Sequence, residues 1–571
     1  MAVIGIDLGT TNSLACIWKD GKAQLIPNSF GEYMTPSVVG VDDDKNIIVG
    51  KTAKERLISH PDKTVSSFKC FMGTDKKISL GDKEYRAEEL SSLVLRKIKE
   101  DAEYYLGESV EEAVISVPAY FNDNGRSATK LAGELAGFKV ERIINEPSAA
   151  ALAYGIDTAE DNTYLVFDFG GGTLDISIVD IFDGVIEIIA VAGDNHLGGD
   201  DFNLAVAKYF CAENGLDFDL IPAEQRAIIL KQAELCKITL SSSSKAGMVA
   251  SINGADYSLV LDSNMLLKAT ASIFDRIKAP MSKALTDASM TADDISDVIL
   301  VGGSSHMPLV QKYLESLFKR EIRCTVSPDT AVAVGVGIVT GIKSRDDGIK
   351  DIVLTDICPF TLGINNYNDA DPYRPIFFPL IERNTTLPAS VEHDFYTSVN
   401  NQREINISVA QGEKYYFAGN LKLGEITVDV PPAPAGKEGV TVRLTYDING
   451  ILQIDVTRIG TNKTKSKTII SNKQLSEDEI KRRLAELEKL KIHPRESDEV
   501  IYLVARAERL FEESKADTRD IIRERLQYFN SVVESQDLRK IRIACENFKK
   551  FLDIADYAGC DPFDYEGDLY D

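Results

Sequence analysis

The sequence lacks the residue clusters that hold zinc or build a disulfide framework. Its 8 cysteines are scattered over 571 residues with no C-x-x-C pair, and its 5 histidines form no ligand pattern. It also lacks an excess of positive charge: the formal net charge is −25, and no dense run of Lys and Arg offers the charge that nucleic-acid phosphates demand. We therefore expect no zinc site, no disulfides and no nucleic-acid partner.

Long apolar runs and a secretory leader are also missing. The longest apolar run, residues 331–342, is too short to span a bilayer and is interrupted by glycines. The N-terminus has no basic segment and carries a carboxylate at Asp7. We expect a cytoplasmic protein with no membrane partner, and a chain of this length should hold several domains.

Two distant segments, residues 4–13 and 166–177, repeat one pattern. Each is an apolar run that ends in an Asp, turns through Gly and Thr, and enters a second β-type segment, which predicts a hairpin with a polar tip. Gly lets backbone N–H groups approach phosphate oxygens, Thr hydroxyls add hydrogen bonds, and the carboxylates suit a hydrated Mg²⁺. A single such turn is more often an ordinary hairpin, but its repetition favours a duplicated fold that clamps one nucleotide.

In this respect the chain resembles the actin, hexokinase and heat-shock ATPase superfamily, whose two phosphate hairpins lie at the floor of a cleft between two lobes. Residues 1–345 alternate β-rich and helical stretches, as an α/β domain should. A linker at 346–357 contains a short apolar segment, and residues 358–475 alternate apolar and polar side chains, which predicts an antiparallel β-domain. A capping box at 476–479 opens a helical segment that runs to 557, and an acidic tail at 558–571 is expected to be disordered.

Further segments, taken in order, resemble one family, the heat shock protein 70 chaperones. They are residues 117–123, 145–155, 193–202, 300–303 and 327–333, and beyond the linker 362–364, 383–388, 411–413 and 430–434. The resemblance implies a multidomain protein: an α/β actin-like (duplicated ribonuclease-H-like) ATPase domain, a β-sandwich peptide-binding domain and an α-helical lid. The lid segment is shorter than usual, so the chain most resembles the shortened HscC-type branch.

The resemblance also implies the nucleotide site, with ATP or ADP and Mg²⁺ as cofactors and K⁺ as a candidate additional ion. Lys69 aligns with the family's catalytic lysine, although on sequence alone it reads as a surface lysine. Asp7, Glu146 and Asp168 would hold the waters around Mg²⁺, and the catalytic set also includes Thr173 and Asp175. The remaining nucleotide-binding positions are Thr10, Thr11, Asn12, Gly170, Gly171, Gly172, Glu234, Lys237, Ser241, Gly302, Gly303, His306 and Asp329.

One of these positions departs from the family pattern. His306 stands where the family usually has an Arg that stacks on adenine, and a neutral imidazole loses cation–π attraction of about 0.5–2 kcal/mol. We therefore expect weaker nucleotide binding. Glu234 and Lys237 also admit a plainer interpretation, as an exposed ion pair of little energy.

For the β-domain, the resemblance implies a pocket for extended apolar client peptides. The aligned positions are Ile364, Phe395, Ile405 and Ile407, with Tyr367 and Ser398 forming an arch; without the alignment, Ile405 and Ile407 read equally as sandwich core. Ile352, Val353 and Leu354 would form the docking linker. Arg142, Asn145 and Ser148 match J-domain cochaperone contacts, Pro118 and Arg126 match the interdomain relay, and a nucleotide exchange factor is a further candidate partner.

The sequence thus predicts an ATP-driven peptide-binding chaperone, with two alternatives. A sugar or glycerol kinase shares the hairpins but has no use for a β-domain and lid, and sugar phosphorylation would reveal it. An actin-like filament protein, or an exchange partner with a vestigial peptide site, would lack ATP turnover that peptides stimulate.

Overall fold

The computed structural model describes residues 2–155, 162–182, 185–194, 196–322, 326–344, 353–368, 371–447, 451–461, 463–470, 493–514 and 516–557. The first part of the predicted linker, the capping box at 476–479 and the acidic tail lie outside these residues. The chain divides into two compact units, Met1–Thr355 and Asp356–Asp571. Within the described ranges, no helix is both long and apolar enough to cross a membrane.

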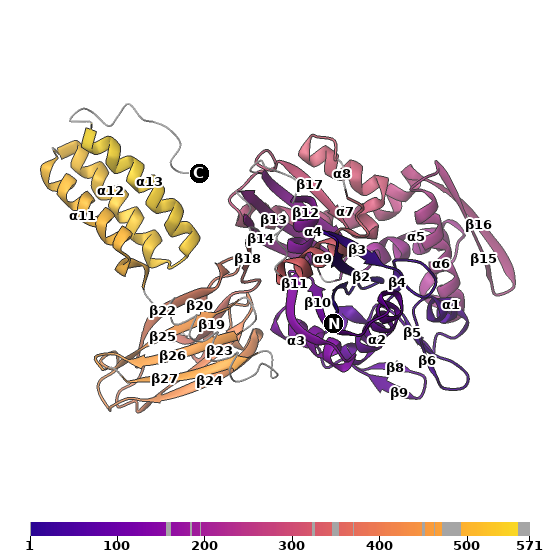
Figure 1. Cartoon of the computed structure of the whole chain (residues 1–571), viewed down its shortest axis with the longest axis horizontal. Coiled ribbons are helices and arrows are strands. Elements are labelled where there is room, and N and C mark those ends of the chain that lie inside the picture. The colour runs from indigo at the N-terminus through magenta and orange to yellow at the C-terminus, as the bar shows by residue number, and fades with distance from the viewer. Residues whose placement is uncertain are drawn as a thin grey trace. The chain divides into compact units, whose positions relative to one another are not determined.

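Two mixed β-sheets form the centre of the first unit (Figure 1). Their strands are β1 (Ala2–Asp7), β2 (Asn12–Lys19), β3 (Lys22–Ile26), β4 (Thr35–Pro36), β10 (Val110–Val117) and β11 (Lys139–Asn145), then β12 (Asn162–Phe169), β13 (Leu174–Phe182), β14 (Val185–Asp194) and β17 (Asp297–Val301). The first sheet has the order β11-β10-β1-β2-β3, with β4 beside β2, and the second contains β17-β12-β13-β14. In each sheet the strand that carries the motif lies between a parallel neighbour and its antiparallel hairpin partner. The two sheets therefore repeat one topology, as the repeated motif predicts.

Helices cover these sheets. Apolar side chains of α2 (Ala87–Leu106) and α3 (Asp123–Leu135) share a core with the first sheet, and those of α5 (Gly199–Glu213), α7 (Ser263–Asp287) and α8 (Pro308–Phe318) share a core with the second. Between them, α4 (Glu146–Gly155) packs against α9 (Ala331–Lys343). The two helices meet backbone to backbone, because a Cβ on Gly335 would lie 1.7 Å from the carbonyl oxygen of Ala149.

Smaller elements complete the first unit. Helix α6 (Ala223–Thr239) shares a core with α5 and the hairpin of β15 (Lys245–Ile252) and β16 (Ala255–Asp262). The others are β5 (Val39–Val41), β6 (Ile47–Val49), α1 (Lys51–Ser59), β7 (Thr64–Val65), β8 (Ile78–Leu80) and β9 (Lys83–Tyr85), with 3₁₀ helices η1 (Phe68–Phe71), η2 (Phe218–Leu220) and η3 (Gly303–His306).

The second unit contains two antiparallel four-stranded sheets around one apolar core, followed by helices. One sheet has the order β20 (Asp371–Ile381), β19 (Leu362–Asn368), β23 (Glu404–Gln411), β24 (Leu421–Asp429). The other has the order β22 (Ala389–Tyr396), β25 (Gly439–Tyr446), β26 (Ile451–Arg458), β27 (Thr464–Ile470). After η6 (Pro494–Glu496), the helices α11 (Asp498–Glu513), α12 (Ala516–Glu534) and α13 (Leu538–Tyr557) form a bundle with its own core, in which Phe529 and Phe548 stack 4.5 Å apart.

One strand, β18 (Val353–Ile357), continues from the first unit into the second. In the first unit, Val353, Leu354 and Thr355 pair in parallel with residues 185–187 of β14, and the Thr355 hydroxyl donates to the carbonyl oxygen of Ile186. In the second unit, the end of β18 pairs with β21 (Thr386–Leu387). The end of the predicted linker is therefore an ordered strand.

Candidate active site

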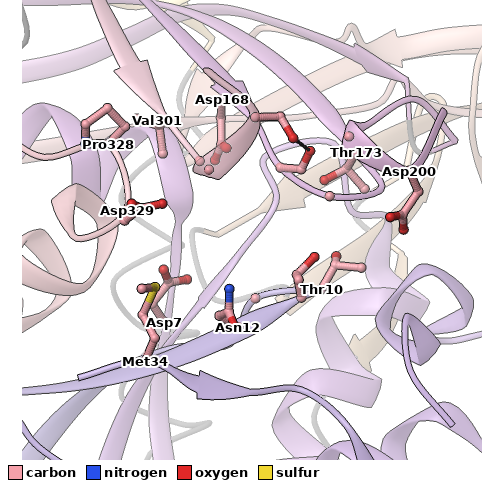
Figure 2. Close-up of a pocket in the computed structure, with 18 of the residues that line it drawn as sticks. Asp7, Thr10, Asn12, Met34, Asp168, Thr173, Asp200, Val301, Pro328 and Asp329 are labelled. Carbon is pink, nitrogen blue, oxygen red and sulfur yellow. Dashed lines mark hydrogen bonds between the residues drawn. The ribbon is translucent and has the colours of Figure 1, made fainter. Parts of the chain in front are cut away.

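The tips of the two predicted hairpins line one cavity of about 310 Å³ in the first unit. Thr10 and Asn12 lie across this cavity from Asp168 and Thr173 (Figure 2). The tips approach closely, because a Cβ on Gly171 would lie 2.1 Å from Oγ1 of Thr11. The predicted residues that line the cavity are Asp7, Thr10, Thr11, Asn12, Lys69, Glu146, Asp168, Gly170, Gly171, Thr173, Glu234, Lys237, Gly302, Gly303 and Asp329.

A buried lysine lies among carboxylates at the floor of this cavity. Lys69, on η1, is only 4% exposed, and its Nζ donates a hydrogen bond of 2.8 Å to Oε1 of Glu146, the first residue of α4. Asp7 and Asp168 come from the ends of β1 and β12, and Asp7 accepts a hydrogen bond of 2.8 Å from the Ser116 hydroxyl. Lys69 is therefore a buried member of an acidic cluster, and the surface interpretation is wrong.

Three aspartates at this cluster have raised pKa values. Burial, and then repulsion from Glu146, raises the pKa of Asp7 to about 7, although Lys69 opposes the shift. The same causes raise the pKa of Asp175 to about 7 and that of Asp168 well above its usual value. Burial alone would lower the pKa of Lys69, but the charge and hydrogen bond of Glu146 outweigh it and raise that pKa. The single positive charge of Lys69 is therefore too little to balance the carboxylates around it.

A hydrated divalent cation fits this arrangement. Asp175 is 3% exposed, and its Oδ1 is buried without a hydrogen-bond partner, so it has a lone pair available for a bound water. Among the described residues, no three His, Cys, Asp or Glu side chains are placed to hold a metal ion directly. A cation here would be held by these carboxylates through water, as Mg²⁺ commonly is.

The other side of the cavity is formed by α6 and by the loops near Gly302 and Asp329. Lys237 donates a hydrogen bond of 3.1 Å to the carbonyl oxygen of Gly199; burial lowers its pKa, and Glu234 and Asp200 oppose the shift. Gly302 has φ +81°, and a Cβ there would lie 2.5 Å from the carbonyl oxygen of Phe169, so a side chain would not fit.

Four predicted residues are absent from the lining. His306 Nε2 lies 3.0 Å from Oδ2 of Asp329, which does line the cavity. Ser241 follows α6 and is exposed. Gly172 lies close to Cys70, because a Cβ on Gly172 would be 3.2 Å from Sγ of Cys70. The fourth residue is Asp175. Its negative charge acts on the cluster, because it raises the pKa of Asp168.

The sequence interpretation missed several lining residues. Met34 lies in the loop between β3 and β4, Lys54 lies on α1, and Asp200 and Asn203 lie on α5. Asp200 belongs to the 193–202 segment that carries the family resemblance, and this membership was the available signal for it. Met34 and Lys54 belong to no motif, and only the folded chain brings them to the cavity.

A comparison with known protein families identifies the family of the chain. The family model described as Hsp70 protein matches residues 3–557. The chain belongs to the Hsp70 family. Hsp70 proteins are ATPases that bind ATP or ADP with Mg²⁺ and act as ATP-dependent chaperones with client peptides, J-domain cochaperones and exchange factors. This chain is accordingly an ATPase and a chaperone.

The residues assigned to peptide binding in this Hsp70 protein lie in or beside the sandwich core. Ile364, Ile405 and Ile407 are 0%, 7% and 2% exposed, and all three belong to that core. Phe395 packs against the core from β22, where its ring lies 5.2 Å from that of Phe378. Tyr367 and Ser398, the predicted arch, are exposed.

The predicted cochaperone and relay positions of this Hsp70 protein lie between the end of β10 and α4 along the chain. Arg126 donates a hydrogen bond of 2.5 Å to Oδ1 of Asn145, and Ser148 is fully buried. Arg142 lies on β11, and the carbonyl oxygen of Pro118 accepts a hydrogen bond from the backbone of Phe121.

Proposed function

We propose that ATP bound in the cavity of the first unit controls how the β-sandwich binds extended apolar segments of unfolded proteins. The observation that carries the proposal is the buried cluster of Lys69 and carboxylates between two facing Gly/Thr tips. Phosphoryl transfer depends mainly on positioning and charge stabilisation. The buried ammonium group of Lys69 and the hydrogen-bond donors of the two tips meet this requirement. They are less suited to covalent catalysis.

Each part of the cavity then has a role. The tips, from Thr10 to Asn12 and from Gly170 to Thr173, would hold the β- and γ-phosphates through backbone N–H and hydroxyl donors. Lys69 would stabilise the negative charge that develops at the γ-phosphate. Asp7, Glu146 and Asp168 would hold the waters around Mg²⁺, and Asp175 would orient the attacking water. When bound, Mg²⁺ would supply charge neutralisation at the phosphates, with K⁺ as an additional ion.

The adenosine would lie on the opposite side of the cavity. Glu234, Lys237 and Ser241 on or just after α6 would face Gly302, Gly303 and Asp329. His306, held by Asp329 at 3.0 Å, would stack on adenine less strongly than the family's Arg. We therefore expect nucleotide to bind less tightly than it would with an Arg at this position.

Peptide capture is proposed for the sandwich. A client would bind as an extended strand, with backbone hydrogen bonds for affinity and one apolar pocket for a side chain. Ile364, Phe395, Ile405 and Ile407 would line that pocket, and Tyr367 with Ser398 would arch over the peptide. Tyr367 stands where the family more usually has Met or Ala, so we expect the range of accepted clients to differ.

The linker would carry the signal between nucleotide and peptide. The pairing of Val353, Leu354 and Thr355 with β14 supports a docked state of the linker on the ATPase unit. A J-domain cochaperone would act near Arg142, Asn145 and Ser148, and Pro118 with Arg126 would relay the change. We also assign the chain to the shortened HscC-type branch and to the cytoplasm.

The test is ATP turnover by the full chain, with and without a panel of extended apolar peptides. We expect peptides to stimulate turnover, each at a concentration that tracks its affinity. Unchanged turnover with every peptide would leave an ATPase without client coupling, and phosphorylation of a sugar would replace the proposal with a kinase.

A further inference from the structure

One arginine of α7 contacts the end of β14 and the segment 196–201, in which α5 begins. Nη2 of Arg276 donates a hydrogen bond of 2.9 Å to Oδ2 of Asp194, the last residue of β14, and Nη1 donates one of 3.1 Å to Oδ1 of Asp201, in the first turn of α5. Nη2 also donates a hydrogen bond of 2.7 Å to the carbonyl oxygen of His196. A planar guanidinium can bind two carboxylates at once, which the point charge of a lysine does less well. The strand end and the start of the helix are therefore tied to one side chain.

The two aspartates in turn hold the backbone of this segment. Oδ1 of Asp194 accepts a hydrogen bond of 2.9 Å from the N–H of His196, and Oδ2 of Asp201 accepts one of 2.8 Å from the N–H of Gly198. Each aspartate therefore binds the segment with one oxygen and Arg276 with the other. Because the guanidinium joins the two carboxylates to α7, it fixes where the segment lies.

The same segment lies directly against the tip of the second hairpin. A Cβ on Gly198 would lie 2.3 Å from the carbonyl oxygen of Gly171. The N–H of Gly199 donates a hydrogen bond of 3.0 Å to the carbonyl oxygen of Gly170, and the N–H of Asp200 donates one of 2.8 Å to that of Gly171. These donors belong to the first turn of α5, where N–H groups have no partner within the helix. The start of α5 therefore fixes the direction of two carbonyl groups of the tip.

The direction of these carbonyl groups decides where the neighbouring N–H groups of the tip point. The peptide bonds of the tip are trans, and in a planar trans peptide the C=O and N–H bonds point in opposite directions. The carbonyl oxygens of Gly170 and Gly171 face α5, so the N–H groups of Gly171 and Gly172 point to the opposite side of the tip. Backbone N–H groups of this tip are the donors that the proposed function assigns to the phosphates.

We propose that Arg276 is a positioning residue for phosphate binding, which holds the second tip in the orientation that presents its N–H groups to the β- and γ-phosphates. The inference rests on the proposed function, which assigns this tip to the phosphates. Arg276 is not among the residues that line the cavity, so it acts through the start of α5. Its side chain is 43% exposed and could bond to water instead, so burial does not require these three partners.

Nucleotide binding by the full chain with Mg²⁺ tests this role through two ligands that differ in one phosphate, ADP and AMP. Dissociation constants are measured by competition with a fluorescent ADP. Arg276→Met removes the guanidinium, and Lys278→Met, at an exposed position of the same helix, is the control that removes the same charge. We expect Arg276→Met to weaken ADP binding at least about tenfold, as loss of one hydrogen bond to a charged group predicts, with little change for AMP.

The ratio of ADP affinity to AMP affinity decides between a positioning and a structural role. A ratio that falls in Arg276→Met and not in Lys278→Met supports positioning. An unchanged ratio, including one in which both ligands bind equally more weakly, overturns it, because Arg276 would then serve only the fold. An equal fall in Lys278→Met also overturns it, because charge alone would explain the effect.

Two further results complete the test. Arg276→Lys keeps the charge without the planar fork, so it gives the same comparison, with a smaller expected fall, if Arg276→Met does not fold. Wild type that binds ADP no more tightly than AMP would overturn the assignment of the tips to the phosphates, and the role of Arg276 with it. Wild type that prefers ADP, beside an Arg276 variant that keeps the full preference, would overturn the role of Arg276 alone.

Discussion

Replacement of Asp175 by Asn should change how the stability of the ATPase unit depends on pH. Asp175 is buried at 3% exposure, and its Oδ1 has no hydrogen-bond partner. Burial and repulsion from Glu146 raise its pKa from 3.8 to about 7. An Asn at this position fills similar space and carries no charge at any pH, so it isolates the cost of ionising this one group.

The sign follows from proton binding. Between pH 3.8 and about 7, the folded protein holds a proton on Asp175 that the unfolded chain has released, so the free energy of unfolding falls as pH rises. Stability from the protonated group is fully present below pH 3.8 and lost as pH rises through about 7. At roughly 1.36 kcal/mol per pKa unit, wild type should lose about 2–3 kcal/mol relative to Asp175→Asn between about pH 5 and pH 8.

The assay is urea unfolding of the full chain without nucleotide or Mg²⁺, at both pH values. The transition of the ATPase unit is identified as the one that ADP with Mg²⁺ shifts. Asp20→Asn, at an exposed turn, is the control and should show no such change. A difference between wild type and Asp175→Asn that stays constant with pH, or is larger at low pH, would refute the reasoning. Added ADP with Mg²⁺ should favour wild type, because the positive charge of a cation bound near the cluster would stabilise the ionised carboxylate of Asp175.

Three further predictions follow from the proposed function. Lys69→Ala should slow single-turnover ATP hydrolysis by roughly 10²–10³ while nucleotide binding stays largely intact, and an unchanged rate would contradict the assigned role. Ile405→Phe should fill the pocket and weaken peptide binding with basal ATPase activity spared; equal affinity by fluorescence anisotropy, in a variant shown to be folded, would count against the pocket. Replacing Val353 and Leu354 together by Asp should abolish the coupling of about 1–3 kcal/mol between nucleotide and peptide, which peptide release rates in ATP and in ADP would measure.

The two hairpins could be predicted from sequence because their signals are local. The Gly/Thr tips follow apolar strands, and the structure pairs β1 with β2 and β12 with β13 as antiparallel hairpins. Strand alternation likewise predicts the antiparallel strands of the second unit. In both cases the alternating side chains and the turn residues that define the hairpin are close together in the sequence. Their prediction therefore requires no long-range information.

Other parts of the site depend on contacts that sequence order does not encode. Lys69 lies on a four-residue 3₁₀ helix far along the chain from Glu146, so only the family resemblance singled it out. Met34 and Lys54 reach the cavity from a loop and from α1. In the sandwich, Ile405 and Ile407 share one face of β23, and alternation alone gives core and pocket residues the same pattern.

The strand order offers a physical route from the carboxylate cluster to the linker. Asp168 and Asp175 lie on paired strands, β14 is the next strand, and Val353, Leu354 and Thr355 pair with β14 at its far end. Coupling between two sites requires an element with two discrete arrangements that both sites bias. A paired segment of three residues suits this requirement, because its few backbone hydrogen bonds contribute only about 0.5–1.5 kcal/mol each. Nucleotide binding that shifts β13 and β14 slightly could therefore tip the segment between paired and free, whereas a longer strand would be too stable to switch.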